Sequence, residues 1–222
     1  VSGKAASITA NHLSKIYGDN NPTLTAVVTG TVTGGDAVNY SLATTAVKLS
    51  DVGDYPVSIT LGSNPNYNIT KTDNTLTVNS KAATITANHL SKTYGDDNPT
   101  LTAVVTGTVT GGDAVNYSLA TTAVKLSGIG DYPISVTLGS NPNYNITKTD
   151  NTLTVNTKAA RITANHLSKT YGDNNPTLTA VVTGTVTGGD AVNYSLATTA
   201  VKLSGIGDYP ISVTLGSNPN YN

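Results

Sequence analysis

Few side chains in this sequence have the chemistry that acid–base catalysis or metal binding requires. The three histidines, His12, His89 and His166, recur 77 residues apart in the same Asn-His-Leu-Ser stretch, and no second ligand stands at a metal-site spacing. The chain has no Cys, which excludes a thiolate metal site and a Cys nucleophile. We therefore expect the histidines to be ordinary loop residues. We predict no catalytic, cofactor-binding or metal-binding residue, and that the chain is not an enzyme.

The acidic residues are all Asp, and they fall in predicted turns, where Asp hydrogen-bonds to nearby backbone groups. Ca²⁺ prefers about six to eight oxygen ligands, usually with several carboxylates among them. Asp51 and Asp54 are close enough in sequence to share an ion, but Gly128 and Gly205 replace Asp51 in the later copies. We expect turn chemistry and no cofactor, with a Ca²⁺ site between domains left open as the alternative.

Tyrosine supplies all of the aromatic side chains, since Phe and Trp are absent. A Tyr at the end of a strand more often caps the core, with its ring buried and its hydroxyl wet, than it stacks on a sugar. Tyr55 and its copies Tyr132 and Tyr209 are nevertheless the candidates for weak ligand contacts, because a groove lined by exposed rings would suit a glycan.

Composition favours an all-β fold. The chain contains 39 Thr, 24 Asn and 21 Gly but no Glu, Gln or Met, so most good helix formers are missing. The net charge is −1, and there is no basic run, which argues against a nucleic-acid or acidic membrane surface. No apolar stretch approaches the roughly 18 residues of a membrane-spanning helix.

An internal repeat of 77 residues organises the chain. The segment Ser14–Pro22 returns as Ser91–Pro99 and again as Ser168–Pro176. Residues 1–68 match residues 78–145 at 59 of 68 positions, and 2 × 77 + 68 gives the full 222 residues. Units this similar cannot each hold a different active site, but they can add length in equal steps.

Period-two alternation predicts short strands within each unit. In the first unit, apolar and polar side chains alternate over 24–32, 38–42 and 57–61, with turn residues at 34–36 and 62–66. Six or seven such strands with frequent turns are typical of a small antiparallel β-sandwich, and an Ig-like topology is the best match.

Two further segments complete the predicted unit. Residues 67–69 and 76–78 are expected to form a hairpin around Asp73-Asn74, and a short strand is expected at 47–49. The predicted domains are three β-sandwich repeats, in which the third stops before its last strand; their bounds are 1–80, 81–157 and 158–222.

The junction between units predicts a stiff connection. The inward-facing positions change from even numbers at Leu76 and Val78 to odd numbers at Ile85 and Ala87, so a break lies near residues 79–83. No Gly- or Pro-rich spacer occurs there. We therefore expect the domains to stack end to end as a rod, on the order of 100 Å long from the rise per strand residue.

Three segments of each unit resemble the YGX-type MBG domain of bacterial surface proteins. In the first unit they are the Tyr-Gly-Asp stretch Tyr17–Ala26, the Gly-Asp-Tyr-Pro stretch Gly53–Ser58, and Asn66–Val78. The resemblance implies tandem β-sandwich modules in secreted or cell-surface adhesin-like proteins, without catalytic residues. The chain departs from the pattern at its end, because Asn222 precedes the counterpart of Ile146–Val155.

These observations lead to three functional hypotheses. The first is a non-enzymatic stalk, spacer or fibre segment of a bacterial extracellular or cell-surface adhesin-like protein, cut as a window from a longer secreted array. The second is a subunit of an extracellular filament assembled by β-strand addition. The third is a weak, multivalent glycan- or protein-binding module. The expected partners are neighbouring repeats, other copies in a filament, or a glycan or host-surface ligand, but no nucleic acid and no membrane.

Overall fold

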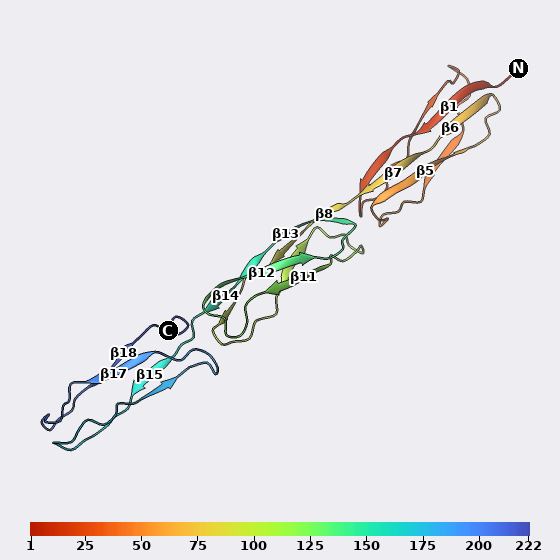
Figure 1. Cartoon of the computed structure of the whole chain (residues 1–222). Coiled ribbons are helices and arrows are strands. Elements are labelled where there is room, and N and C mark those ends of the chain that lie inside the picture. The colour runs from red at the N-terminus through yellow and green to blue at the C-terminus, as the bar shows by residue number, and fades with distance from the viewer. The chain divides into compact units, whose positions relative to one another are not determined.

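The computed structural model describes residues 1–222, and all of its regular elements are β-strands (Figure 1). The first repeat contains seven: β1 (Lys4–Ala10), β2 (Leu13–Ile16), β3 (Ala26–Thr29), β4 (Tyr40–Thr44), β5 (Gly53–Leu61), β6 (Tyr67–Thr72) and β7 (Asn74–Asn79). No helix of a length and hydropathy suited to crossing a membrane is present. The predictions of an all-β fold and of tandem repetition are confirmed.

Two small sheets make up the first repeat. One has the strand order β3-β1-β6 and the other β2-β7-β5-β4. The β1–β3, β4–β5 and β5–β7 pairs are antiparallel, as predicted, whereas β1–β6 and β2–β7 run parallel. The sheets are therefore mixed, because β1 and β2, which are consecutive in the chain, each run beside a strand from the end of the repeat. The Ig-like topology stays a prediction.

The predicted hairpin around Asp73-Asn74 is wrong. Strands β6 and β7 flank that turn, but β6 joins the sheet of β1 while β7 lies between β2 and β5. The side chain of Asp73 accepts a hydrogen bond from the backbone N–H of Ile59 at 2.8 Å, so the turn is bonded to β5. The strand expected at residues 47–49 is instead a turn, in which Ser50 N–H donates to Val47 O at 3.1 Å.

The core of the first repeat draws on both sheets. Ile8 from β1, Val57 and Ile59 from β5, and Leu76 from β7 are all buried and belong to one apolar cluster. Each lies at a position where alternation predicted an inward side chain, so the sequence pattern and the burial agree. Thr and Ser occupy the intervening positions.

The second repeat has the same plan. Its strands are β8 (Lys81–Ala87), β9 (Leu90–Thr93), β10 (Ala103–Thr106), β11 (Tyr117–Thr121), β12 (Gly130–Leu138), β13 (Tyr144–Thr149) and β14 (Asn151–Asn156). The strand orders are β10-β8-β13 and β11-β12-β14-β9. The equivalent core positions, Ile85, Ile134 and Leu153, are again fully buried.

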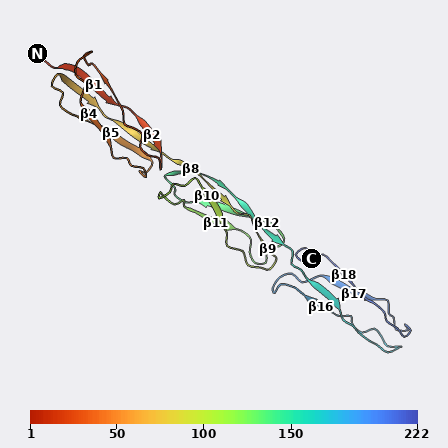
Figure 2. The same ribbon diagram turned by 180° about the vertical axis from the view of Figure 1, so that it is seen from behind.

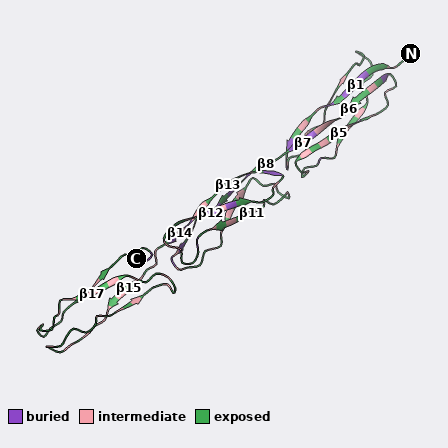
Figure 3. Cartoon of the chain, viewed as in Figure 1, coloured by how far each residue is buried: buried purple, intermediate pink, exposed green.

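The third repeat contains four strands, β15 (Arg161–Ala164), β16 (Ala180–Thr183), β17 (Tyr194–Thr198) and β18 (Ile211–Leu215). They form two antiparallel pairs, β15–β16 and β17–β18, and the members of the second pair lie side by side in both views (Figures 1 and 2). Strand β15 carries no buried residue, in contrast to its counterparts β1 and β8 (Figure 3). The buried residues of this repeat are Asn220 and Tyr221.

The chain folds into two compact units whose limits cut through the middle repeat. One unit combines residues 1–86, 104–118 and 136–149, and the other combines residues 87–103, 119–135 and 150–222. Each unit therefore contains one whole junction between consecutive repeats. The domain boundaries predicted at 80/81 and 157/158 stay predictions.

Candidate functional site: the joint between consecutive repeats

A buried tyrosine lies at the centre of the junction between the first and second repeats, called here the first joint. Tyr17 directly follows β2, and its backbone N–H donates to Asn79 O at the end of β7 at 2.8 Å. Only 1% of Tyr17 is exposed. A ring this size buries a large apolar area, provided that its hydroxyl finds a hydrogen-bond partner.

The second repeat supplies that partner. The backbone N–H of Asp113 donates to the Tyr17 hydroxyl at 2.9 Å. The Tyr17 ring meets the Tyr144 ring edge to face, with centroids 5.6 Å apart and an interplanar angle of 82°. The Tyr144 hydroxyl in turn donates to Asp113 O at 2.9 Å and accepts from Val109 N–H at 3.1 Å. Both hydroxyls are thus satisfied inside the joint, and the two rings have one favourable orientation.

Apolar packing surrounds the two rings. Val78 at the end of β7 and Ala83 in β8 are buried in the same cluster as Tyr17 and Tyr144. Further side chains from both repeats pack against this cluster: Tyr55, Val109, Val115 and Ile146. The repeats therefore share a small core of their own at the joint.

Two glycines let the repeats approach this closely. Gly18 has φ +88°, and a Cβ added there would stand 2.5 Å from a methyl of Val109. A Cβ added at Gly112 would stand 2.8 Å from the Tyr17 hydroxyl. Contacts this short are not tolerated, so any larger residue at either position would push the repeats apart.

An asparagine at the edge of the joint is almost completely buried. Asn143 is 1% exposed, and its Oδ1 accepts from Val52 N–H at 2.8 Å. Its Nδ2 donates to the carboxylates of Asp51 and Asp113, each at 2.7 Å. The Val52 contact fixes the orientation of the amide, so that its NH₂ group faces both acids. Each of these bonds to a charged acceptor is a strong one.

The chain connection adds to this bonding. Strand β7 ends at Asn79 and β8 begins at Lys81, so one residue separates them. The backbone N–H of Lys81 donates to Asn143 O at 3.0 Å, and β8 then pairs with β13. A linker of this length is too short to act as a flexible coil. The stiff connection expected from the sequence stays a prediction.

The junction between the second and third repeats, the second joint, repeats the arrangement. Tyr94 is 1% exposed and meets Tyr221 edge to face at 5.5 Å and 87°. Asp190 N–H donates to the Tyr94 hydroxyl at 2.9 Å. Asn220 accepts from Ile129 N–H at 2.9 Å and donates to the Asp190 carboxylate at 2.7 Å.

The two joints differ in the carboxylates that accept from the buried asparagine. Asp51 in the first joint is replaced by Gly128 in the second, so Asn220 lacks the second carboxylate that Asn143 has. Asp51 was also one of the candidate ligands for a Ca²⁺ site between domains. In the first joint its carboxylate and that of Asp113 accept hydrogen bonds from the NH₂ group of Asn143, and the amide oxygen of Asn143 points elsewhere. The structure contains no group of three His, Asp or other ligating side chains that would hold a metal ion.

The candidate ligand-contact tyrosines lie beside these joints. The Tyr55 hydroxyl donates to Asp51 O at 3.0 Å, and its half-buried ring packs against the first-joint cluster. Tyr132 occupies the same place at the second joint, where its hydroxyl donates to Gly128 O at 3.0 Å. Tyr209 is more exposed and bonds to Gly205 O at 3.1 Å. The structure does not bring the three together, and ligand binding by them stays a prediction.

The histidines take part in side-chain bonds within their own repeats. His12 Nδ1 lies 3.1 Å from Thr75 Oγ1, and His89 Nδ1 lies 3.1 Å from Thr152 Oγ1. Each bond joins the loop after β1 or β8 to strand β7 or β14. His166 lines a cleft in the third repeat.

Sequence reasoning missed the joint residues, although it used some of them as the anchor of the repeat. Tyr17-Gly18 begins the segment that reveals the period of 77, and Asn143-Tyr144 belongs to the Asn-Tyr-Asn segment. The available signal was a bulky Tyr at a strand end, where an aromatic ring does not suit an exposed turn. That signal does not indicate which surface the ring meets.

A buried lysine supports the turn that carries the joint tyrosine. The Lys15 ammonium donates to Val47 O at 2.5 Å and to Asp19 O at 3.1 Å. Burial lowers the pKa of Lys15, and the nearby charge of Asp19 acts in the opposite direction. Lys92 repeats this arrangement with Val124 O at 2.6 Å. The ammonium thus ties the loop after β2 to the loop after β4.

Comparison with known proteins identifies the repeat. The family model described as MBG domain (YGX type) matches the chain three times, at residues 6–77, 83–154 and 160–222. No curated protein matches the chain. The three matched stretches follow one another along the chain, and the two intervals between them carry the linkers of the two joints.

Proposed function

Because the chain belongs to the MBG domain family of the YGX type, we propose that it is a non-enzymatic structural segment, a stalk or spacer, of a bacterial extracellular or cell-surface adhesin-like protein. One observation carries this proposal: the same joint is built twice from the same residue types. Tyr17 and Tyr94 are buried against Tyr144 and Tyr221 with nearly equal ring geometry.

A joint of this kind suits a spacer because it fixes each repeat against the next. Bending the first joint would separate the two rings, break the Asp113–Tyr17 hydrogen bond and expose the buried amide of Asn143. Leaving a buried polar group without a partner costs about 1–3 kcal/mol, so the fixed arrangement is favoured over a hinged one. Stability is expected to be a sum over repeats and joints.

The test compares the natural chain with one whose joints are loosened. We expect small-angle scattering from chains of increasing repeat number to show a maximum dimension that rises by an equal step per repeat. A variant with Gly-Ser residues inserted after Ser80 should lose that regular step while each repeat stays folded. Equal dimensions for the natural and the loosened chain would contradict the spacer function.

Location needs a separate measurement. Antibodies raised against the chain should label intact cells of the source organism, and brief protease treatment of those cells should remove the label. Labelling only after the cells are broken would contradict the proposed extracellular location.

A further inference from the structure

The first repeat begins and finishes with two segments that lie side by side. The entry segment, residues 4–16, contains β1 and β2, and the exit segment, residues 67–79, contains β6 and β7. Strand β1 pairs with β6, and β2 pairs with β7 (Figures 1 and 2). Both pairs are parallel, so the two segments cross the repeat in the same direction. Together they are called here the parallel ribbon.

The register of the pairing is constant along the parallel ribbon. Lys4 faces Tyr67 at the start of β1, and Leu13 faces Leu76 at the start of β2, so the partners are 63 positions apart in both pairs. This register is kept although both segments pass from one sheet to the other between these strands. The two strand pairs therefore form one continuous element.

Side chains connect the two segments where they change sheets. Asn74 Nδ2 donates to Ala10 O at 3.0 Å, and His12 Nδ1 lies 3.1 Å from Thr75 Oγ1. Each contact joins a residue of the entry segment to a residue of the exit segment. The ribbon thus remains bonded across the only stretch where its backbones leave a sheet.

Backbone hydrogen bonds extend the pairing to both ends of the repeat. Lys4 N–H donates to Asn66 O at 2.9 Å, and Tyr17 N–H donates to Asn79 O at 2.8 Å. The ribbon therefore runs from the first residue of β1 to the tyrosine of the first joint.

The second repeat has the same ribbon. Strand β8 pairs in parallel with β13, and β9 pairs in parallel with β14. Asn151 Nδ2 donates to Ala87 O at 3.0 Å, and His89 Nδ1 lies 3.1 Å from Thr152 Oγ1. Backbone pairing and side-chain contacts are thus both repeated.

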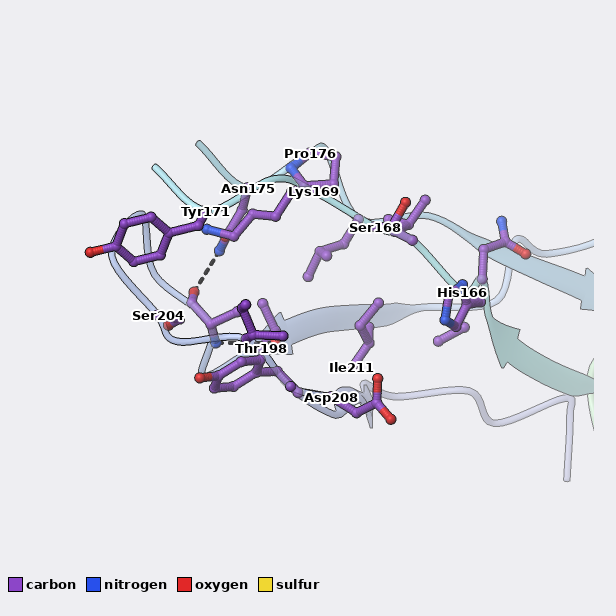
Figure 4. Close-up of a pocket in the computed structure, with 18 of the residues that line it drawn as sticks. His166, Ser168, Lys169, Tyr171, Asn175, Pro176, Thr198, Ser204, Asp208 and Ile211 are labelled. Carbon is purple, nitrogen blue, oxygen red and sulfur yellow. Dashed lines mark hydrogen bonds between the residues drawn. The ribbon is translucent and has the colours of Figure 1, made fainter. Parts of the chain in front are cut away.

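The entry segment also recurs in the third repeat. Lys158 forms a parallel bridge to Tyr221, which is again 63 positions later. His166 and Ser168 belong to this segment and line the cleft of that repeat (Figure 4). The pairing therefore begins in one register in all three repeats.

The direction of the two segments determines how tension acts on a repeat. The chain enters the first repeat at Lys4, at one end of the ribbon, and leaves it at Asn79, at the opposite end. Tension along the chain therefore pulls the entry and exit segments in opposite directions along their own axes. The hydrogen bonds of a parallel pair are evenly spaced, so they carry such a load together. A sideways pull would break them one after another.

No compliant spacer separates one ribbon from the next. Strand β7 ends at Asn79 and β8 begins at Lys81. Lys81 N–H donates to Asn143 O at 3.0 Å, which is the bond that begins the second ribbon. Tension that leaves the first repeat therefore passes directly to the entry segment of the second.

We propose that each repeat is a mechanical clamp, in which the parallel pairing of residues 4–16 with residues 67–79, and of their counterparts, resists tension along the chain in shear. The clamp deepens the proposed stalk function and rests on it for the source of the load. Forced unfolding is governed by the unfolding rate, so loading these bonds together keeps a repeat folded for longer under tension.

Single-molecule pulling in two directions tests the clamp. The chain has no Cys, so handles can be attached to engineered thiols in the full chain. Ser2→Cys with Ser80→Cys loads the first ribbon in shear, whereas Ser2→Cys with Ser63→Cys separates its two segments from one end; all three serines are exposed. We expect the shear direction to need at least about twice the unfolding force, because its bonds break together. Equal forces, or a lower force in shear, would overturn the proposal.

The length released on unfolding identifies the event. Opening of the whole first repeat between residues 2 and 80 should release about 230 Å, given about 3.5 Å per extended residue and about 3.3 Å per residue of the folded ribbon. A much shorter release at the highest force would show that another part of the repeat resists the tension, and would overturn the clamp.

Two asparagines distinguish mechanical resistance from stability. Asn74 bonds to Ala10 O across the ribbon, whereas Asn21 Nδ2 donates to Ala46 O at 2.6 Å between two loops. Asn74→Ala should speed unfolding at a fixed shear force about tenfold, because a bond that carries the load is lost. Asn21→Ala should lower stability in urea by a similar amount but change the rate under force less than about twofold, because its bond is still formed when the ribbon breaks. Equal rates for the two variants under load would contradict the clamp.

The clamp and the stalk function can fail separately. Equal forces in the two directions, in a chain whose dimension rises by an equal step per repeat, would reject the clamp and keep the spacer. A higher force in shear, in a chain without that regular step, would keep the clamp as a property of the fold and reject the spacer.

Discussion

One tyrosine position occurs three times in this chain, once in each repeat. Its side chain is buried in the two joints but exposed in the third repeat. Tyr17 and Tyr94 are each 1% exposed, whereas Tyr171 is 65% exposed. The sequence around the three is nearly identical. The comparison teaches that this residue is buried where two repeats meet. Tyr17 packs against Val78 of its own repeat and against Tyr144 of the next, so its burial depends on both sides of the joint.

The largest expected effect is the loss of that buried ring. Tyr17→Ala should lower the stability of the first joint by about 4 kcal/mol, because it removes an aromatic side chain and leaves a cavity. Tyr171→Ala is the matched control and should change stability by less than about 0.5 kcal/mol, since the ring is largely solvated. Hydrogen exchange of the β8 amides measures the effect. Equal losses for the two variants would show that Tyr17 acts within its own repeat.

Two copies of one glycine allow the energetic cost of a steric contact to be distinguished from that of backbone strain. Gly18 and Gly172 have similar dihedral angles, φ +88° and +91°, but a Cβ would strike Val109 at Gly18 and nothing within 4 Å at Gly172. Gly172→Ala should therefore cost only the left-handed strain, about 1 kcal/mol. Gly18→Ala should cost about 3 kcal/mol, because the contact adds to the strain.

Thermal unfolding of the two glycine variants, followed by hydrogen exchange at β8 and β15, distinguishes the two costs. If Gly18→Ala were no worse than Gly172→Ala, the close approach of the repeats at the first joint would be wrong.

The next comparison concerns the side-chain amide of an asparagine that is buried in a joint and exposed in the first repeat. Asn143 in the first joint and Asn66 in the first repeat are copies of one position, but only Asn143 is buried. Asn143→Ala should cost about 2 kcal/mol, because Val52 N–H and two carboxylates lose their partner in a buried place. Asn66→Ala removes an exposed bond to Asp36 and should cost less than about 0.5 kcal/mol. Urea unfolding of both variants checks the difference, and similar costs would contradict a role for Asn143 in the joint.

The sequence was enough to predict what alternation and repetition encode. The period of 77, the all-β fold and the inward positions such as Ile8, Val57 and Leu76 all follow from local pattern. Strand pairing was less accessible. The pattern around Asp73-Asn74 predicts a hairpin, but nothing local shows that β6 and β7 enter different sheets. Strand β6 pairs with β1 and β7 pairs with β2, each more than 60 residues earlier, and β7 also pairs with β5.

The joint was beyond sequence reasoning for a related reason. Tyr17 lies 96 residues from Asp113 and belongs to another repeat, so no periodicity connects them. Tyr55, chosen as a ligand candidate because it is aromatic, packs at the edge of the same cluster. The residue types alone place tyrosine rings near strand ends. They do not show which side chains the rings contact, because those contacts form between consecutive repeats.

The smallest expected effect concerns the natural Asp-to-Gly difference between the joints. Asp51→Gly gives the first joint the residue that Gly128 provides in the second, and it removes one of the two carboxylates that accept from Asn143. The expected cost is about 1 kcal/mol, the usual contribution of one hydrogen bond, because Asp113 still accepts from the same amide. The reverse change, Gly128→Asp, should strengthen the second joint by a similar amount, since it places a carboxylate within reach of Asn220. Hydrogen exchange at β8 and at the Lys158 amide measures the two joints separately. A gain of stability at the second joint and a loss at the first would show that this position adjusts the strength of a joint. No change at either joint would mean that Asp113 and Asp190 are the only carboxylates that stabilise the two buried asparagines.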